Sequence, residues 1–418
     1  MSQDPGNLPE GMPLSFGLPQ IQQCPFAAYN KLRPDTPVYK DPLTGNYVLT
    51  RYADVRRATL DVKNLSSRTG LGSTRDTAAK EETDAIYDAK GYRPMDTLIS
   101  NDPPSHRMYR QLVDKAFTPN KIDELEPHID EIIHGLIDQF IDKPEIDFLA
   151  EFAIKLPMIV IAEQLGVDSK DMDRFKIWSD VSVESQDPTM TYEREIEVVN
   201  ILTDMQQYMA AACERLRKNP DGMLLSRLVH AEVDGRQLDT PELLSILQQL
   251  IVAGNETTTT TLASGMKQMI ERPELVAQLR ADPSKMRQFV EETLRVMAPI
   301  QTMFRKVNED TEIHGVKIPA GSMIEVRFGA ANRDAAEFPN PDVIDLDRPN
   351  ANTHLAFGVG PHLCIGNQLA RGELRLAFKA LIDRMDNFRA SRGEDSYKYT
   401  PLYIAYGPTQ LWMNFDKR

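Results

Sequence analysis

The most informative stretch of the sequence is residues 357–371, FGVGPHLCIGNQLAR. Glycine and proline residues precede Cys364, Gly366 follows it, and the apolar periodicity of an α-helix begins directly afterwards. This pattern predicts a cysteine in a tight loop at a helix N-terminus. Free backbone N–H groups and the helix dipole both favour a thiolate there, so Cys364 is a candidate axial metal ligand. A buried structural cysteine beside a turn is the alternative interpretation.

Charge and composition narrow the class of protein. The chain carries 48 Lys and Arg against 62 Asp and Glu, a net charge of -14, which argues against nucleic acid as a partner because phosphate needs clustered basic surface. Its three cysteines, Cys24, Cys213 and Cys364, fit neither a disulfide framework nor a zinc site. No secretory signal and no apolar run of the ~20 residues that span a membrane is present. We therefore expect a cytoplasmic protein.

The organisation along the chain predicts a mainly helical protein. Residues 1–35, rich in Pro, Gly and Gln, predict an extended N-terminal arm, and residues 36–418 a single catalytic domain. Segments 38–52 and 312–328 predict two β-hairpins of one small sheet. A long apolar helix is expected from an N-cap at Thr240 to about Glu271, and a second from Asp282 to before Pro299.

The cysteine loop resembles the haem-ligand loop of cytochromes P450, whose pattern is Phe-Gly-x-Gly-x-His-x-Cys-x-Gly. All six fixed positions match, namely Phe357, Gly358, Gly360, His362, Cys364 and Gly366. The resemblance extends from about residue 37 to the C-terminus. It implies the P450 fold, a triangular helical domain with a small β-rich region, and haem b as cofactor. Phe357, Cys364 and Gly366 would contact the haem, with Cys364 as the thiolate ligand of its iron.

A second motif supports the resemblance. Glu292 and Arg295 match the family's Glu-x-x-Arg motif, and their spacing places carboxylate and guanidinium on one helix face. Taken alone, such a pair is more often a solvated ion pair. The resemblance implies a buried structural pair, with Arg348 as its third partner, that holds the haem site in place.

On the long helix, residues 253–258, AGNETT, match the family's oxygen-activating signature. Glycine inside a helix costs about 1 kcal/mol relative to alanine and needs a compensating reason. The missing side chain at Gly254 would let a ligand or a diatomic molecule approach the backbone. The resemblance assigns Ala253 and Gly254 to contact with the cofactor, and the Glu256 carboxylate and Thr257 hydroxyl are candidates for proton delivery. Residues 258–261, all threonine, are expected to pack and to bond back to preceding carbonyls.

The haem propionates require buried cations or hydrogen-bond donors. The resemblance assigns this role to His106, Arg110, Arg305 and His362. The other five histidines, His128, His134, His230, His314 and His354, fit no site and are expected to be surface or core residues.

The resemblance implies a monooxygenase that uses dioxygen and two electrons to hydroxylate or epoxidise a small molecule. No reductase signature is present, so a ferredoxin and an NAD(P)H-dependent reductase are the expected partners. A basic docking patch is expected from Arg107, Arg110, Arg371 and Arg375. The pocket is expected to be mainly apolar and to favour a terpenoid, norisoprenoid, steroid-like or alkyl-aromatic substrate; its predicted residues are Leu98, Ile99, Gln249, Val252, Ala253, Ile300, Gln301, Met303 and Ile404.

Three alternatives remain open at this point. A peroxygenase of the same fold usually lacks the acid-alcohol pair that Glu256 and Thr257 form. A P450 that isomerises, dehydrates or couples its substrate agrees with every residue named. A non-catalytic thiolate-haem sensor would be expected to carry an output domain, which this sequence does not show.

Overall fold

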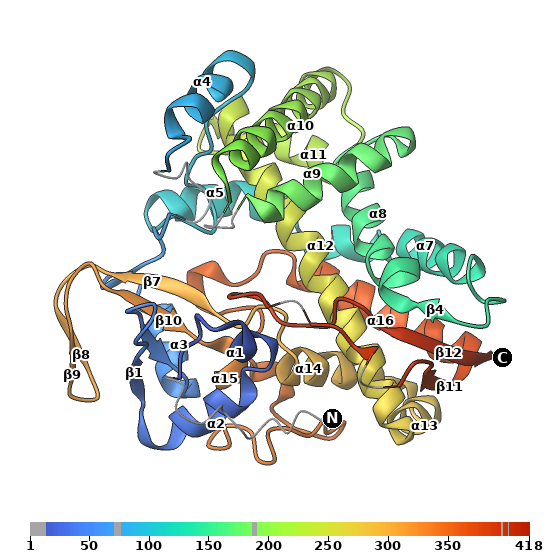
Figure 1. Cartoon of the computed structure of the whole chain (residues 1–418). Coiled ribbons are helices and arrows are strands. Elements are labelled where there is room, and N and C mark those ends of the chain that lie inside the picture. Colours follow the sequence, from blue (N-terminus) through green and yellow to red (C-terminus); the bar gives the residue numbers. More distant parts are fainter. Residues whose placement is uncertain (1–13, 71–76, 186–189, 394–395, 400) are drawn as a thin grey trace. The chain divides into compact units, whose positions relative to one another are not determined.

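The structure is a computed structural model that describes residues 14–70, 77–185, 190–393, 396–399 and 401–418 (Figure 1). The chain divides into two compact units that alternate along the sequence. Unit 1 combines residues 1–66, 126–156 and 257–418, and unit 2 combines residues 67–125 and 157–256. Neither unit is one continuous stretch of chain, and the single domain over 36–418 stays a prediction.

Unit 1 contains a five-stranded sheet that joins distant parts of the sequence. Its strand order is β1-β2-β10-β7-β3, with parallel pairing between β2 and β10 and antiparallel pairing elsewhere. The strands are β1 Val38–Lys40, β2 Tyr47–Leu49, β3 Leu65–Ser66, β7 Met303–Val307 and β10 Met323–Val326. The hairpin predicted within 38–52 is therefore present, but of the second predicted segment, 312–328, only β10 joins its sheet.

The hairpin predicted within 312–328 is wrong in its pairing. Strand β9 (Val316–Ile318) pairs with β8 (Thr311–Ile313), on its N-terminal side, while β10 pairs with β7 and β2. The tight turn at His314 and Gly315, both with positive φ, closes the β8–β9 hairpin instead. A third sheet of unit 1 has the order β11-β12-β4, from Met385–Ala390, Trp412–Lys417 and Ile146–Asp147.

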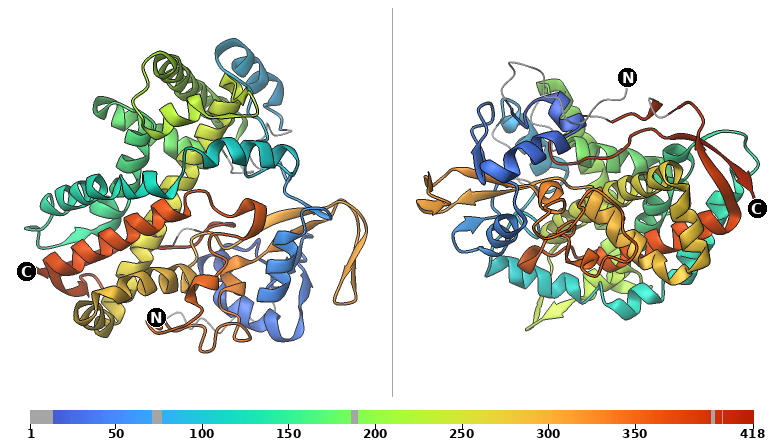
Figure 2. Two further views of the ribbon diagram at one scale, coloured as in Figure 1. Left: turned by 180° about the vertical axis from the view of Figure 1, so that it is seen from behind. Right: turned by 90° about the horizontal axis from the view of Figure 1, so that it is seen from below.

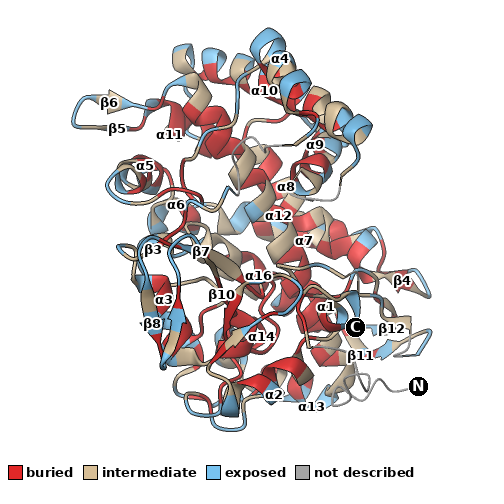
Figure 3. Ribbon diagram, turned by 60° about the vertical axis from the view of Figure 1, so that its left-hand side comes forward, coloured by how far each residue is buried: buried red, intermediate tan, exposed pale blue. Residues whose placement is uncertain are grey.

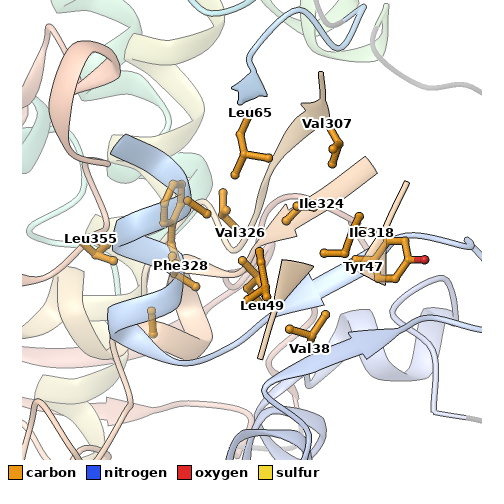
Figure 4. Packing of buried hydrophobic residues seen from close by; sticks show 14 residues of the cluster. Val38, Tyr47, Leu49, Leu65, Val307, Ile318, Ile324, Val326, Phe328 and Leu355 are labelled. Atoms are coloured by element: carbon orange, nitrogen blue, oxygen red, sulfur yellow. The ribbon is translucent and has the colours of Figure 1, made fainter. Parts of the chain in front are cut away.

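The apolar core of the five-stranded sheet also holds the segment that leads into the cysteine loop. Leu49, Ile324, Val326 and Phe328 of this core are buried, and Leu355 is 2% exposed in the same cluster (Figure 4). The partly buried Ile300, Met303 and Val359 pack against it. Residues 300, 303 and 355–359 are thereby placed by one hydrophobic cluster.

Residues 14–35 are not an extended arm, which corrects the prediction for the described part of 1–35. They form α1 (Pro19–Gln23) and α2 (Phe26–Asp35). Phe16, Tyr29 and Leu32 are buried with Val48 of β2 in one cluster. The frequent Pro and Gln hid an apolar helix face at positions 28, 29 and 32. Residues 1–13 lie outside the described part.

The cysteine helix α16 (Asn367–Arg384) packs against three helices of unit 1, namely α7 (Glu126–Asp138), α13 (Pro273–Ala281) and α14 (Met286–Val296). Figure 2 shows α7 and α16 side by side from behind. Unit 1 also contains α3 Tyr52–Leu60 and α15 Phe328–Ala331, the π-helix η1 Leu149–Ala153, and the 3₁₀ helices η3 Pro283–Lys285, η4 Ala351–Thr353 and η5 Gly360–His362. Every residue of α14 from Phe289 to Val296 is buried, which Figure 3 shows in red.

Unit 2 is mainly helical, with α10 packed against α4, α9 and α11. Its only sheet among the described residues is the β5–β6 pair, Glu232–Val233 and Arg236–Gln237. Its helices are α4 Lys80–Lys90, α5 Ser105–Asp114, α6 Pro119–Asp123, α9 Met172–Glu184, α10 Tyr192–Lys218 and α11 Leu224–His230, with the short turn η2 Ser169–Asp171. Helix α8 (Lys155–Gln164) begins in unit 1 and continues into unit 2.

The long helix α12 (Thr240–Glu271) contributes residues to both units and has the predicted extent. Its N-cap, however, is Asp239 rather than Thr240. The Asp239 carboxylate accepts the Glu242 N–H at 2.9 Å, and the Glu242 carboxylate accepts the Asp239 N–H at 3.0 Å, which is a capping box. Among the described residues, no helix is both long and apolar enough to span a bilayer.

Candidate haem-thiolate site

Cys364 lies two residues before the N-cap of α16, in a loop whose turns require glycine. Gly358 and Gly360 have φ values of 67° and 76°, where a side chain would be strained. The Cys364 N–H donates to the Phe357 carbonyl at 2.8 Å and closes the loop. Cys364 is partly exposed, and a Cβ on Gly366 would meet no atom within 4 Å. The loop thus presents a thiol beside open space at the start of an 18-residue helix.

The Glu-x-x-Arg motif forms a fully buried network in unit 1. Arg295 donates to Glu292 at 2.6 and 2.9 Å, and both side chains are 0% exposed. Arg348 donates to the same carboxylate at 3.0 Å. Both arginines also donate to backbone carbonyls in 332–343, including Val343. Glu292, Arg295 and Arg348 thus form a buried network within unit 1, and their role in holding the haem site in place stays a prediction.

The arginines expected on α16 for docking are engaged in ion pairs. Arg371 donates to Glu291 at 2.6 and 3.0 Å, and Arg375 pairs with Glu126 of α7. Arg110 pairs with Asp114 at 3.1 Å. Within the described residues, Arg107 is the one arginine of the predicted patch that is exposed and forms no ion pair. Acidic neighbours on α5, α7 and α14 therefore neutralise three of the four arginines in the predicted patch.

The middle of α12 is less buried than the rest of the helix. Ala253 is exposed, although most neighbouring positions are buried. A Cβ on Gly254 would meet Ile161 at 3.6 Å, an ordinary contact, so packing alone does not demand glycine there. Asn255 donates to Ser179 at 3.0 Å. Burial raises the pKa of Glu256, and Asp180 adds to the rise while Lys176 opposes it.

The threonine run divides into different roles. Thr261 donates to the Thr257 carbonyl at 2.8 Å, the back-bond expected of it, and Thr259 donates to the Ala153 carbonyl of η1 at 3.0 Å. Thr258 instead hydrogen-bonds the carboxyl of Glu373 on α16. Burial raises the pKa of Glu373 to about 8, although this bond acts in the opposite direction. Sequence reasoning missed Glu373, because a Glu after an Arg-Gly pair on a helix reads as a surface residue.

The predicted propionate ligands fall in both units. His106 is 2% exposed, and burial together with Arg110 lowers its pKa to about 4, so it is a neutral hydrogen-bond donor at pH 7. In unit 1, Arg305 of β7 is 4% exposed and His362 of η5 is half-buried. A buried guanidinium suits a buried carboxylate ligand, because each neutralises the other.

The side-chain amide of Gln249 connects α12 to the segment that carries two other predicted pocket residues, Leu98 and Ile99. Gln249 donates to the Thr97 hydroxyl at 2.7 Å and accepts the Ile99 N–H at 3.1 Å. Ser245, one turn earlier on α12, accepts the Met95 N–H at 3.1 Å. The segment that carries Leu98 and Ile99 is therefore fastened to α12, and the Gln249 amide is used inside the protein.

The pocket residues predicted in unit 1 also lie together, with one correction. The Gln301 N–H donates to the Ile404 carbonyl at 2.7 Å, and Ile300 is bridged to Ala405. The Gln301 side chain is 3% exposed; its Oε1 accepts from Tyr29 at 2.9 Å and its Nε2 donates to the Ala298 carbonyl at 2.6 Å. Gln301 is therefore a structural residue with no amide group directed at a ligand.

These observations fit a haem when each unit is considered by itself. Unit 1 offers a thiol at a helix start, the buried cation Arg305, and accessible apolar residues such as Met303. Unit 2 offers His106 and Arg110 one turn apart and the exposed Ala253 on α12. Within unit 1, a thiolate, a buried cation and apolar surface are groups that a haem-thiolate site requires.

Known proteins agree with this class. The family model described as Cytochrome P450 matches residues 185–398. Putative cytochrome P450 YjiB of Bacillus subtilis is 36% identical over 361 residues, covering 86% of both chains. The solved bacillaene polyketide synthase cytochrome P450 PksS of B. subtilis has a TM-score of 0.86 and 30% identity, covering 97% of this chain and 100% of its own.

A further solved relative carries a ligand. CYP109E1 of Bacillus megaterium in complex with corticosterone has a TM-score of 0.81 and 29% identity, covering 94% of this chain and 99% of its own, and it is also known in complex with testosterone. The site and fold define a haem-thiolate protein. The chain belongs to the cytochrome P450 family, and it is a monooxygenase of that family.

Replacing Glu373 by Gln is expected to stabilise the protein in a pH-dependent way. Below pH ~4.5 both folded and unfolded states hold the proton, so the change is small. As pH rises to about 8 the unfolded chain ionises while folded Glu373 stays protonated, so wild-type stability falls by on the order of 3–5 kcal/mol. The variant lacks this loss, so its advantage in thermal midpoint should grow between pH 5 and pH 8.5.

The exposed Glu312→Gln variant serves as the control and should show no such trend. An advantage of Glu373→Gln that is equal at both pH values would mean that Glu373 is ionised in the folded protein.

Proposed function

We propose that this protein is a haem b monooxygenase that hydroxylates or epoxidises a compact hydrophobic molecule, and that the Cys364 thiolate would hold the haem iron. The observation that carries the proposal is the cysteine loop. Two glycines with positive φ and the bond from the Cys364 N–H to Phe357 present the sulfur at the start of α16. A thiolate gains there from the helix dipole and from nearby backbone N–H groups.

Bound haem supplies the reduction of dioxygen and the transfer of one oxygen atom to the substrate. The chain supplies the ligand Cys364, the cofactor contacts Phe357, Gly366, Ala253 and Gly254, and the propionate partners His106, Arg110, Arg305 and His362. Two chemically distinct partners are available, since His106 is neutral at pH 7 and the arginines are cations.

Glu256 and Thr257 are proposed to deliver protons to the reacting oxygen. They are adjacent on α12, and both side chains are half-buried. Burial raises the pKa of Glu256, so this carboxyl holds a proton to higher pH than an exposed one. The Thr257 hydroxyl both donates and accepts, which a proton relay requires.

The substrate is proposed to be recognised by shape and apolar contact. Leu98, Ile99, Val252, Ile300, Met303 and Ile404 are apolar, and the amides of Gln249 and Gln301 are bonded within the protein. Apolar burial contributes about 25 cal/mol per Å², which favours a rigid hydrocarbon skeleton. The corticosterone and testosterone complexes of the CYP109E1 relative favour steroid-like molecules among the candidate classes.

Electrons are proposed to come from a ferredoxin that an NAD(P)H-dependent reductase reduces, in the cytoplasm. Arg107 is the exposed cation that supports docking of an acidic carrier, whereas Arg371 and Arg375 are already paired. Exposed pairs of this kind affect association rates more than affinity.

The central test is the absorption of the reduced carbon monoxide complex. Wild type should show the red-shifted band that thiolate ligation produces, and Cys364→Ser should lose it even where haem is retained. Cys213→Ser, a buried cysteine on α10, is the matched control and should keep the band. A histidine-type spectrum in folded wild type would overturn the proposal.

Thr257→Ala is expected to uncouple the enzyme. Electron input stays intact while proton delivery is disturbed, so NAD(P)H and oxygen should be consumed with peroxide released in place of product. Thr257→Ser keeps the hydroxyl and should restore coupling. Equal product per NAD(P)H in wild type and Thr257→Ala would remove Thr257 from the mechanism.

The substrate class is tested by titrating the resting enzyme with steroids, terpenoids, alkyl-aromatics and fatty acids while the spin-state spectrum is recorded. Steroids and other rigid skeletons should shift the spectrum at the lowest concentrations. A response confined to fatty acids or strongly polar compounds would contradict an apolar, shape-selective pocket.

A further inference from the structure

Helix α14 carries two adjacent buried carboxylates that serve different parts of unit 1. Glu292 binds Arg295 and Arg348 and holds residues 332–343, as described above. Glu291 is 3% exposed and belongs to neither the Glu-x-x-Arg motif nor the cysteine loop. Its partners come from the segments on either side of Cys364.

On the N-terminal side of the loop, Glu291 binds His354. The two groups are 3.1 Å apart, from His354 Nε2 to the carboxylate. His354 Nδ1 accepts the Ala356 N–H at 3.1 Å, so the ring proton lies on Nε2 and the neutral imidazole donates to Glu291. His354 is therefore not core filler but connects Glu291 to the backbone at the start of the loop.

On the C-terminal side, Glu291 binds the guanidinium of Arg371 in a two-point ion pair, at 2.6 Å from Nε and 3.0 Å from Nη2. The remaining nitrogen, Nη1, donates to Asn367 Oδ1 at 2.7 Å, and Asn367 Nδ2 donates to the Cys364 carbonyl at 2.5 Å. The Arg371 guanidinium also lies 4.4 Å from the centroid of the Phe357 ring.

The Cys364 carbonyl has a direct influence on the backbone beside the sulfur. A peptide unit is planar, so fixing the carbonyl of Cys364 also fixes the direction of the Ile365 N–H. The preceding N–H, that of Cys364, is fixed by the Phe357 carbonyl at 2.8 Å, and Phe357 in turn packs under Arg371. Both peptide units that flank the Cys364 side chain therefore depend on Arg371, and Arg371 depends on Glu291.

We propose that Glu291 is a positioning residue for the haem thiolate, acting through Arg371 and Asn367 on the peptide units that flank Cys364. This inference rests on the proposed function, since it concerns Cys364 as an iron ligand. It assigns Arg371 to the ligand loop in place of a docking surface. Loss of the Glu291 charge leaves the guanidinium without its counter-ion and releases Asn367 from the carbonyl.

The test compares holoenzyme variants of the full chain. Glu291→Gln keeps the shape and removes the charge. Asn367→Leu leaves Glu291 and Arg371 paired and removes both bonds of the Asn367 amide, the one from Arg371 Nη1 and the one to the Cys364 carbonyl. Glu126→Gln is the matched control, because Glu126 pairs with Arg375, one turn farther along α16 from the loop. Three properties are measured. They are the rate at which the thiolate-type band of the carbon monoxide complex is lost on mild warming, the haem reduction potential, and the rate of backbone hydrogen exchange in residues 354–366.

In Glu291→Gln and Asn367→Leu the thiolate-type band should be lost about tenfold faster than in wild type, which is the factor expected for losing one hydrogen bond to a charged group. Both should shift the reduction potential in the same direction and speed exchange in 354–366, while Glu126→Gln should match wild type. Asn367→Leu keeps the test decisive where Glu291→Gln fails to fold, because its side chain is only half-buried.

The inference would be overturned if both variants lost the band at the wild-type rate and kept the wild-type reduction potential and hydrogen exchange. It would also be overturned by a uniform loss of thermal stability that leaves the potential unchanged, since that would be a purely structural role. A defect seen with a purified [2Fe–2S] ferredoxin but absent with dithionite would return Arg371 to docking and also overturn it. A wild type without the thiolate-type band would instead refute the proposed function.

Discussion

Unit 1 depends on the neutralisation of buried carboxylates on α14. An unpaired buried charge costs several kcal/mol, and removing one partner of a buried pair typically costs 3–5 kcal/mol. Glu292 is satisfied by two arginines that also bind the carbonyls of 332–343, and Glu291 by Arg371 and His354, which flank the cysteine loop. Because both carboxylates belong to consecutive residues of one helix, residues 332–343 and the cysteine loop are positioned against the same rigid element.

In the interior of unit 1, a side-chain hydrogen bond between Thr258 and Glu373 connects α12 to α16. A protonated Glu373 donates and accepts without charge, so it can stay buried near neutral pH. Gly265 allows the two helices to approach, since a Cβ there would meet the Phe378 ring at 2.3 Å. The helix that carries the acid-alcohol pair and the helix that follows the cysteine are therefore joined by both packing and a polar contact.

The polar residues of the expected pocket illustrate how tertiary contacts decide chemistry. The sequence predicts Gln249 and Gln301 as pocket residues, yet each amide satisfies backbone or side-chain groups of its own unit. A buried polar group left without a partner is costly, so folding uses these amides first. What remains accessible at the expected pocket positions of unit 2 is apolar, as at Ala253 and Ile99, which supports the proposal that substrate is recognised by shape.

Sequence alone determined the family, the extent of α12, and the residues of the cysteine loop, because each is written locally as a spacing of glycine, cysteine and capping residues. It also placed Glu292 and Arg295 on one helix face. It did not show residues 14–35 as a packed helical segment, the pairing of β10 with β7 and β2, or the roles of Glu291, His354, Arg371 and Glu373. Those depend on partners tens to hundreds of residues away, and a charge that reads as solvated in the sequence becomes structural only when folding removes it from water.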